Sequence, residues 1–263
     1  MIKFIASDLD GTILQNKAQH VDESVLDVIG SLVKKGVLFA PASGRQIESL
    51  KKLFAPVADE LVYISENGAL VKYKNTVINK MPIERKLAME MIADVDSVEN
   101  CEVLVSGEHF AYIRPKSETF LHRMTKVVNY ETKIVKRFED IDEDIIKVAV
   151  CDLSGIVNSR EHFFDGWADK ASVAVSGDLF LDMTAQGVNK GVGIKKIQEF
   201  FGLKADECMA FGDNFNDVQM LESVGYSYAM QNAVDEIKAH AANVTDSVEK
   251  ILRQVDKNID AVI

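Results

Sequence analysis

The first 80 residues alternate between short apolar runs and amphipathic segments. Residues 2–7 form an apolar run with β-branched and aromatic members, as expected of a buried strand. Residues 21–35 repeat apolar positions at helical spacing, and Gly36 is a helix stop signal. Apolar runs at 37–42 and 61–64 predict two further strands. Alternation of this kind indicates a parallel sheet that helices cover on both faces.

A helix is expected between the second and third of these strands. It would open at Ser43 and Gly44 and run to about Phe54. Ser43 is then a candidate helix N-cap, because its hydroxyl can accept a hydrogen bond from a free amide of the first turn. The turn signal after the third strand predicts a hairpin of residues 69–73 and 76–78.

The middle of the chain has a different pattern, in which strands occur in pairs between helices. We expect helices at 83–95, 117–128 and 159–168, and strands at 102–105, 110–113, 147–152, 171–175 and 180–183. Paired strands joined by short turns favour a mainly antiparallel sheet. This stretch is therefore predicted to be a separate α/β domain.

The last stretch returns to simple alternation of strands and helices. It predicts helices at 192–201, 218–224 and 247–255, and strands at 208–211 and 227–229. We therefore expect an α/β fold in which residues 1–82 and 184–263 form a parallel-sheet core. Residues 83–183 would be the inserted α/β domain with a mainly antiparallel sheet.

Charge and cysteine content narrow the class of protein. With 30 Lys and Arg against 41 Asp and Glu, the net charge of −11 gives no broad attraction for nucleic acid or for anionic membranes. The three cysteines are far apart, which argues against disulfides and zinc and favours a cytoplasmic protein. The first residues do not resemble a signal peptide, and no apolar run approaches the roughly 18 residues of a membrane helix.

Four polar clusters follow predicted strands or begin predicted helices. They are DLDGT at 8–12, SGR at 43–45, NKG at 189–191 and GDNFND at 212–217. The carboxyl ends of strands in a parallel sheet share one edge, so clusters that are distant in sequence are expected to meet there. That proximity is a geometric requirement of every functional interpretation below.

Asp8 and Asp10 are spaced to face one side of an extended chain. Two carboxylates aimed at one site repel each other unless a cation or a shared proton compensates them. Asp213 and Asp217 follow a later strand, and carboxylate oxygens suit Mg²⁺. Ordinary acidic turns would give the same residues no chemical role, but the combination of clusters favours a metal site.

Lys190 and the residues near Ser43 are candidates for binding an anion. A lysine at a helix start opposes the helix dipole unless an anion binds beside it. The Ser43 hydroxyl and the Gly44 amide can hold a phosphate oxygen, although Ser43 as an N-cap and Lys190 as a solvated lysine remain alternatives. Arg45 has no assigned role beyond surface charge.

Together the four clusters resemble the motifs of the haloacid dehalogenase superfamily of phosphatases. The GDNFND form, the ENGA segment at 66–69 and the inserted domain are similar to its Cof-type, sugar-phosphatase-like subfamily. This resemblance implies a Rossmann-like core with an inserted cap domain that determines substrate specificity. It covers the chain from Asp8 to Asp217 and is specific because the motifs occur in combination.

The resemblance also implies roles for individual residues. Asp8 would be the nucleophile and Asp10 the general acid and base. The other implied residues are Leu9 (through its backbone), Ser43, Gly44, Lys190 and Asn216 for phosphate or substrate, and Asp8, Asp10 (through its carbonyl), Asp213 and Asp217 for Mg²⁺. Asp217 supports either the metal or Lys190. His109, Arg114 and Asp182 are candidate cap contacts to the substrate, with surface or sheet-pairing roles as the alternative.

The resulting prediction is Mg²⁺-dependent hydrolysis of small phosphate monoesters through an aspartyl-phosphate on Asp8. The partner would be a small phosphorylated metabolite such as a sugar phosphate, and the protein a monomer or a homodimer. A sugar phosphomutase would use the same intermediate, and a non-catalytic sugar-phosphate sensor would keep the fold. A glycosyltransferase interpretation of the DxD pattern leaves Lys190 and the GDNFND cluster without a role.

Overall fold

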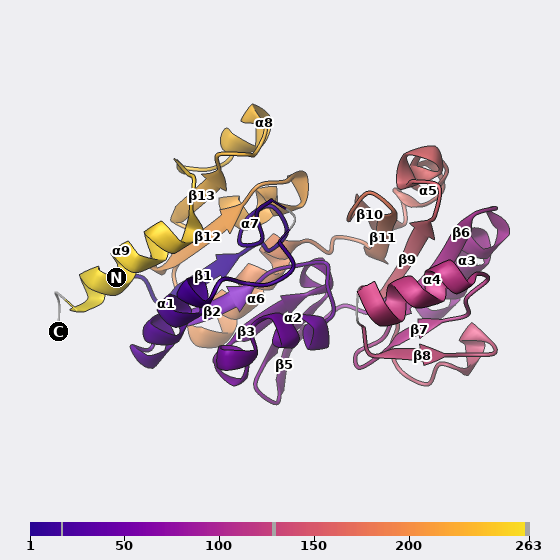
Figure 1. The fold of residues 1–263 in the computed structure, drawn as a ribbon, viewed down its shortest axis with the longest axis horizontal. Coiled ribbons are helices and arrows are strands. Elements are labelled where there is room, and N and C mark those ends of the chain that lie inside the picture. The colour runs from indigo at the N-terminus through magenta and orange to yellow at the C-terminus, as the bar shows by residue number, and fades with distance from the viewer. Residues whose placement is uncertain (17, 128–129, 261–263) are drawn as a thin grey trace. The chain divides into compact units, whose positions relative to one another are not determined.

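The computed structural model describes residues 1–16, 18–127 and 130–260 and divides into two units (Figure 1). Met1–Asn79 and Asn189–Ile263 form the first unit, and Lys80–Val188 form the second. The predicted limits of the inserted domain are residues 83 and 183. The helix predicted at 117–128 and the core segment predicted at 184–263 both extend beyond the described residues.

In the part of the chain that the structure describes, the first unit contains a parallel sheet of five strands. Its order is β14 (Asn243–Thr245), β13 (Tyr226–Met230), β12 (Cys208–Gly212), β1 (Phe4–Ser7) and β2 (Leu38–Pro41). All four residues of β1 are buried, as the continuous apolar run predicts for a strand covered on both faces. Ser7 pairs with Pro41 on one side and Phe211 on the other, so β1, β2 and β12 end at the same level.

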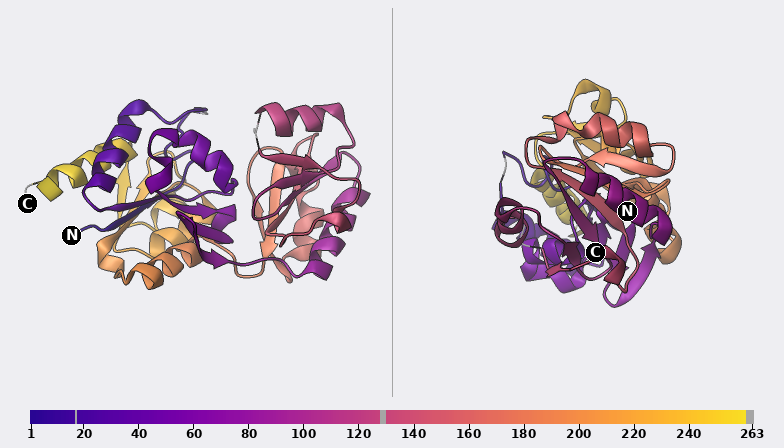
Figure 2. Two further views of the ribbon diagram at one scale, coloured as in Figure 1. Left: turned by 90° about the horizontal axis from the view of Figure 1, so that it is seen from below. Right: turned by 90° about the vertical axis from the view of Figure 1, so that its right-hand side faces the viewer.

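Helices cover both faces of this sheet (Figure 2, left). They are α1 (Glu23–Lys34), α2 (Ile47–Leu53), α6 (Lys190–Phe201), α7 (Val218–Glu222), α8 (Asp235–Lys238) and α9 (Val248–Asp260). On one face, α6, α7 and α8 contribute Ile194, Met220 and Ile237 to a core with Phe4 and Ala210. On the other face lie α1, α2 and α9.

A small sheet extends the first unit beyond β2. It consists of β3 (Val62–Ser65), β4 (Leu70–Tyr73) and β5 (Thr76–Lys80), and a parallel bridge from Ala42 to Ile64 joins it to the end of β2. The turn between β3 and β4 passes through positive φ at Glu66, Asn67 and Gly68. This turn brings the ENGA segment next to residues that follow β2, because the Asn67 amide donates to the Ser43 carbonyl at 2.9 Å.

The second unit contains a six-stranded sheet in the part of the chain that the structure describes. Its order is β10 (Ala171–Val175), β11 (Phe180–Ala185), β9 (Lys147–Asp152), β6 (Cys101–Ser106), β7 (Ala111–Ile113) and β8 (Thr132–Ile134). Neighbours pair antiparallel except β7 and β8, which are parallel. The helices α3 (Arg85–Ser97) and α5 (Arg160–Trp167) contribute to one core and α4 (Glu118–His122) to another. The predicted α/β fold class, with a parallel core and an inserted cap, is confirmed.

The predicted start of one helix is wrong, and three short elements lack a prediction. Helix α2 begins at Ile47 with Gln46 as its N-cap, so Ser43 neither opens nor caps it. The reason is that the Ser43 backbone is engaged with the segment after β3: its amide donates to Ile64 and its carbonyl accepts from Asn67. The short elements β8, β14 and α8 were not predicted. Among the described residues, no helix is both long and apolar enough to span a membrane.

Candidate active site

Asp8 directly follows β1, at the carboxyl edge of the parallel sheet. Its amide donates to the Phe211 carbonyl of β12 at 2.9 Å, which fixes the ends of the two strands side by side. The residue is 6% exposed. The parallel register therefore delivers the Asp8 carboxylate to the start of the loop that holds Asp213.

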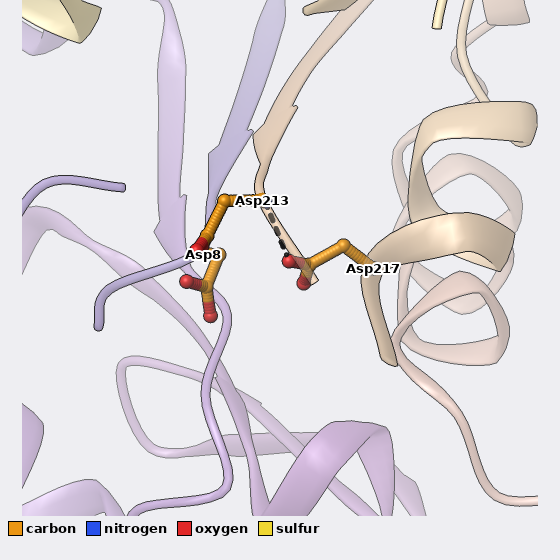
Figure 3. Close-up of side chains that lie close together, drawn as sticks. All are labelled: Asp8, Asp213 and Asp217. Atoms are coloured by element: carbon orange, nitrogen blue, oxygen red, sulfur yellow. Dashed lines mark hydrogen bonds between the residues drawn. The ribbon is translucent and has the colours of Figure 1, made fainter. Parts of the chain in front are cut away.

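Three carboxylates meet at this edge (Figure 3). Asp8, Asp213 and Asp217 each offer an oxygen, and these oxygens lie within 4.8 Å of one another. Asp8 and Asp217 are buried and Asp213 is half-buried. Ionised carboxylates repel each other at this separation, and burial of two of them weakens the screening by water, so the arrangement requires positive charge.

Lys190 supplies part of that charge. It is the first residue of α6, and its fully buried ammonium lies 2.5 Å from Asp8 Oδ1 and 2.6 Å from Asp217 Oδ1. Burial by itself lowers the pKa of Lys190, but the charges of Asp217 and Asp8 outweigh it and hold the pKa above its usual value. The two carboxylates thus offset the unfavourable position of a cation at a helix N-terminus.

Negative charge nevertheless exceeds positive charge in the cluster. Burial raises the pKa of Asp8 well above its ordinary value, and the neighbouring Asp217 raises it further, against the opposing effect of Lys190. Burial also raises the pKa of Asp213. A divalent cation would relieve this excess, and hard carboxylate oxygens are ligands that such a cation prefers. The donor set therefore fits a metal ion, with Asp8 and Asp213 as the residues that would hold it.

Asp217 also organises the loop that leads to it. Its Oδ2 accepts from the backbone amides of Asp213 at 2.9 Å and Asn214 at 3.0 Å, while its Oδ1 accepts from Lys190. A Cβ on Gly212 would lie 2.5 Å from the Asp217 Cβ, which explains the glycine at the strand end. Both oxygens of Asp217 are thus already engaged, and its geometry favours support of Lys190 and of the loop.

Two residues that sequence reasoning missed orient Asp213. The Thr12 hydroxyl donates to Asp213 Oδ1 at 2.8 Å, and the Asn232 side chain donates to Asp213 Oδ2 at 3.3 Å and to the Gly11 carbonyl at 3.0 Å. Gly11 has φ +95°, and a Cβ there would lie 2.2 Å from Asp213 Oδ2. Thr12 lies in the DLDGT cluster, but Asn232 lies in a turn after β13 where no pattern marked it.

Asp10 is separate from the buried cluster. Its side chain is 58% exposed and forms an ion pair with Arg45, with 2.6 Å from Arg45 Nη2 to Asp10 Oδ1. A second contact of 3.1 Å joins Arg45 Nε to Asp10 Oδ2. Arg45, which has no assigned role in the sequence motifs, therefore contacts the predicted general acid and base.

The remaining predicted site residues surround this edge of the sheet. The side chain of Leu9 is buried, and Ser43 follows the end of β2, where its hydroxyl accepts from the Arg45 amide at 3.3 Å. Asn216 donates to the Asn67 side chain at 3.3 Å, which links the GDNFND loop to the ENGA turn. Gly44 lies between Ser43 and Arg45 in the same segment.

The candidate cap contacts have partners within the second unit. His109 Nδ1 lies 3.0 Å from Glu143 Oε2, and Arg114 pairs with Asp96. Asp182 is buried and lies 3.3 Å from the ammonium of Lys147. The structure thus gives each of the three a local structural role.

Comparisons with known proteins give consistent results. The family model for haloacid dehalogenase-like hydrolases matches residues 5–251. An Escherichia coli protein, the 5-amino-6-(5-phospho-D-ribitylamino)uracil phosphatase YbjI, is 24% identical, with 96% of this chain and 97% of that protein covered. A Eubacterium rectale protein with a known crystal structure is 30% identical in sequence to this chain. The two structures match with a TM-score of 0.83, and the match covers 97% of this chain and 99% of the other. The subclass IIB sugar phosphatase BT4131 is similar in fold, with a TM-score of 0.80 at 22% identity, covering 96% and 98% of the two chains.

Proposed function

The chain belongs to the haloacid dehalogenase-like hydrolases, as a phosphatase of their Cof-type subclass IIB, and we propose that it hydrolyses small phosphate monoesters with Asp8 as nucleophile and Mg²⁺ as its metal. The observation that most supports this proposal is that the side chains at one edge of the sheet lie within a few ångströms of each other; they are those of Asp8, Asp213, Asp217 and Lys190. A buried carboxylate beside an ammonium and a site for a divalent cation is suited to attack on an anionic phosphoryl group.

The reaction would take two steps at phosphorus. The Asp8 carboxylate attacks in line and forms an aspartyl-phosphate as the bond to the leaving oxygen breaks, which replaces one difficult step with two easier ones. Asp10 gives its proton to the leaving oxygen and then takes a proton from the water that attacks the aspartyl-phosphate. Inorganic phosphate leaves, and both aspartates return to their starting state.

Positive charge lowers the barrier to this attack. Mg²⁺, when bound, supplies charge that offsets the phosphoryl oxygens. Lys190 keeps its ammonium beside Asp8, where the pKa shift holds it protonated, so it stabilises the charge that develops near the nucleophile. Ser43, Gly44 and the Leu9 backbone would hold the phosphoryl oxygens, and Asn216 would contact phosphate or substrate.

The proposed substrate is a small phosphorylated metabolite, with sugar phosphates as the leading class. The names of the Escherichia coli relative and of BT4131 support this class, since both are phosphatases of small molecules. The inserted cap would select the leaving group. The buried, unpaired cysteines at 101, 151 and 208 agree with a cytoplasmic setting.

The test is a phosphate-release screen with Mg²⁺ and, in parallel, with EDTA. The substrates are hexose, pentose and nucleotide monophosphates, flavin mononucleotide and pyridoxal phosphate. Asp8→Asn should abolish release, and Asp10→Asn should slow it by about 10²–10⁴-fold. Asp27→Asn, the same change at an exposed position of α1, is the matched control and should leave the rate unchanged.

Three results would contradict the proposal. Asp8→Asn with wild-type turnover would remove the nucleophile assignment. Conversion of a sugar phosphate to its isomer without phosphate release would indicate a phosphomutase. Binding of a sugar phosphate with neither reaction would indicate a sensor.

A further inference from the structure

Arg45 contacts both carboxylate oxygens of Asp10. Arg45 Nη2 lies 2.6 Å from Asp10 Oδ1, and Arg45 Nε lies 3.1 Å from Asp10 Oδ2. Two parallel N–H···O contacts from one planar group fix the rotation of a carboxylate as well as its position. The pair joins the loop after β1 to the segment between β2 and α2, which are 35 residues apart in the sequence.

The backbone of Arg45 is itself held in place. Its carbonyl accepts from the Ser65 hydroxyl at 2.8 Å and from the Glu66 amide at 3.3 Å. Its amide donates to the Ser43 hydroxyl at 3.3 Å. The guanidinium therefore extends toward Asp10 from a fixed backbone, whereas the Asp10 side chain is 58% exposed at the start of a turn.

Stability alone does not account for this pair. Ion pairs that water can reach contribute little to folding, because water screens them and ordering two side chains costs entropy; here the Asp10 side chain is 58% exposed and that of Arg45 is 31% exposed. The ends of β1 and β2 are already joined by backbone hydrogen bonds, including the Ala42 amide to the Ser7 carbonyl at 2.8 Å. The pair's specific effect is on the direction of the Asp10 carboxylate.

We propose that Arg45 is a positioning residue that holds the Asp10 carboxyl group in the orientation needed to give its proton to the leaving oxygen. This assignment rests on the proposed function. A general acid must lie within hydrogen-bond reach of the atom it protonates, and a misplacement of about 1 Å can cost roughly 10²-fold in rate. Lysine would not replace Arg45 fully, because an ammonium is a point charge that cannot grip both oxygens in one plane.

The test compares two esters that differ in their need for an acid. The leaving group of p-nitrophenyl phosphate departs as a stable phenolate, whereas glucose 6-phosphate must lose an alkoxide and needs the proton. The measured quantity is kcat/KM, which covers the steps up to departure of the alcohol. Where another alkyl phosphate is hydrolysed faster than glucose 6-phosphate, that ester takes its place.

Arg45→Met should lower kcat/KM for the alkyl ester by about 10- to 100-fold and for p-nitrophenyl phosphate by less than about threefold. Arg45→Lys should give an intermediate loss for the alkyl ester. In an Asp10→Asn background, Arg45→Met should cause no further loss, since residues that act as one unit are non-additive. Lys51→Met removes a surface ion pair with Glu48 on α2 and should change neither ester.

The outcomes separate this assignment from the proposed function. Equal losses for both esters, or losses that multiply with those of Asp10→Asn, would overturn the positioning role while leaving the phosphatase assignment intact. A wild-type protein that releases phosphate from neither ester with Mg²⁺ present would overturn the proposed function and the role of Arg45 with it.

Discussion

Replacement of Lys190 by methionine removes the buried positive charge of the site while keeping an unbranched side chain of similar length. Its ammonium lies 2.5 Å from Asp8 Oδ1 and 2.6 Å from Asp217 Oδ1, with the lysine and Asp217 side chains fully buried and that of Asp8 only 9% exposed. The variant therefore leaves two neighbouring carboxylates in a dry environment without their shared partner.

The expected cost follows from that geometry. Removal of one member of a buried ion pair typically destabilises a protein by about 3–5 kcal/mol, because the remaining charge is uncompensated. Asp8 limits the cost because burial and the neighbouring Asp217 already raise its pKa, so it takes up a proton readily. Asp217 also keeps its two backbone amide donors. We expect a loss near the lower end of this range, about 3 kcal/mol.

The assay is urea unfolding and thermal unfolding followed by circular dichroism, with EDTA present so that a bound cation cannot replace the ammonium. A loss of 3 kcal/mol corresponds to a fall of about 6–12 °C in Tm for a domain of 150–250 residues. The matched control is Lys196→Met on the same helix, where the lysine is 43% exposed and pairs with Glu199. Such a surface substitution should change stability by less than about 0.5 kcal/mol.

A small change in stability would refute this reasoning. If the free energy of unfolding of Lys190→Met lies within about 1 kcal/mol of the wild-type value, or if this variant is no less stable than Lys196→Met, then Lys190 does not compensate a buried charge cluster. The electrostatic basis of the proposed site would then be wrong, independently of any activity measurement.

Asn232→Ala should weaken Mg²⁺ binding by about tenfold, because it removes a hydrogen bond that orients the ligand Asp213; isothermal titration of the protein without substrate measures this, and an unchanged affinity would contradict it. In the native protein, Cys101, Cys151 and Cys208 should resist iodoacetamide at pH 8, since all are buried and burial raises the pKa of each thiol, that of Cys151 to about 12. Mass spectrometry reports the alkylation, and rapid modification before unfolding would show that these thiols are accessible.

The sequence alone indicated the fold because its signals are local. Continuous apolar runs such as residues 2–7 predict buried parallel strands, and helical spacing predicts what covers them. These signals fail for short, exposed elements: in β8 two of the three residues are exposed, so no alternation marks it. The start of α2 also failed, because tertiary hydrogen bonds from Ser43 to Ile64 and Asn67 overrode its preference for a helix N-cap.

The candidate site was predictable in part for the same reason. Asp8, Lys190 and Asp213 lie at strand or helix ends, and a parallel sheet brings its strand ends to one edge. The contacts made by individual side chains were not predictable. Nothing near Asn232 in the sequence indicates that it reaches Asp213 and Gly11. The sequence around Arg45 likewise indicates a surface charge and not its pairing with Asp10.

The sequence by itself therefore determined which chemical groups this protein has and at which edge of the sheet they gather. Only the tertiary structure decided which partner each group has: Lys190 between two aspartates, Asp217 on its own loop, and Arg45 on Asp10. The physical reason is one of range. Strand and helix periodicity depends on neighbours a few residues away, whereas a hydrogen bond between separate loops depends on positions that the packing of the whole unit fixes to within an ångström.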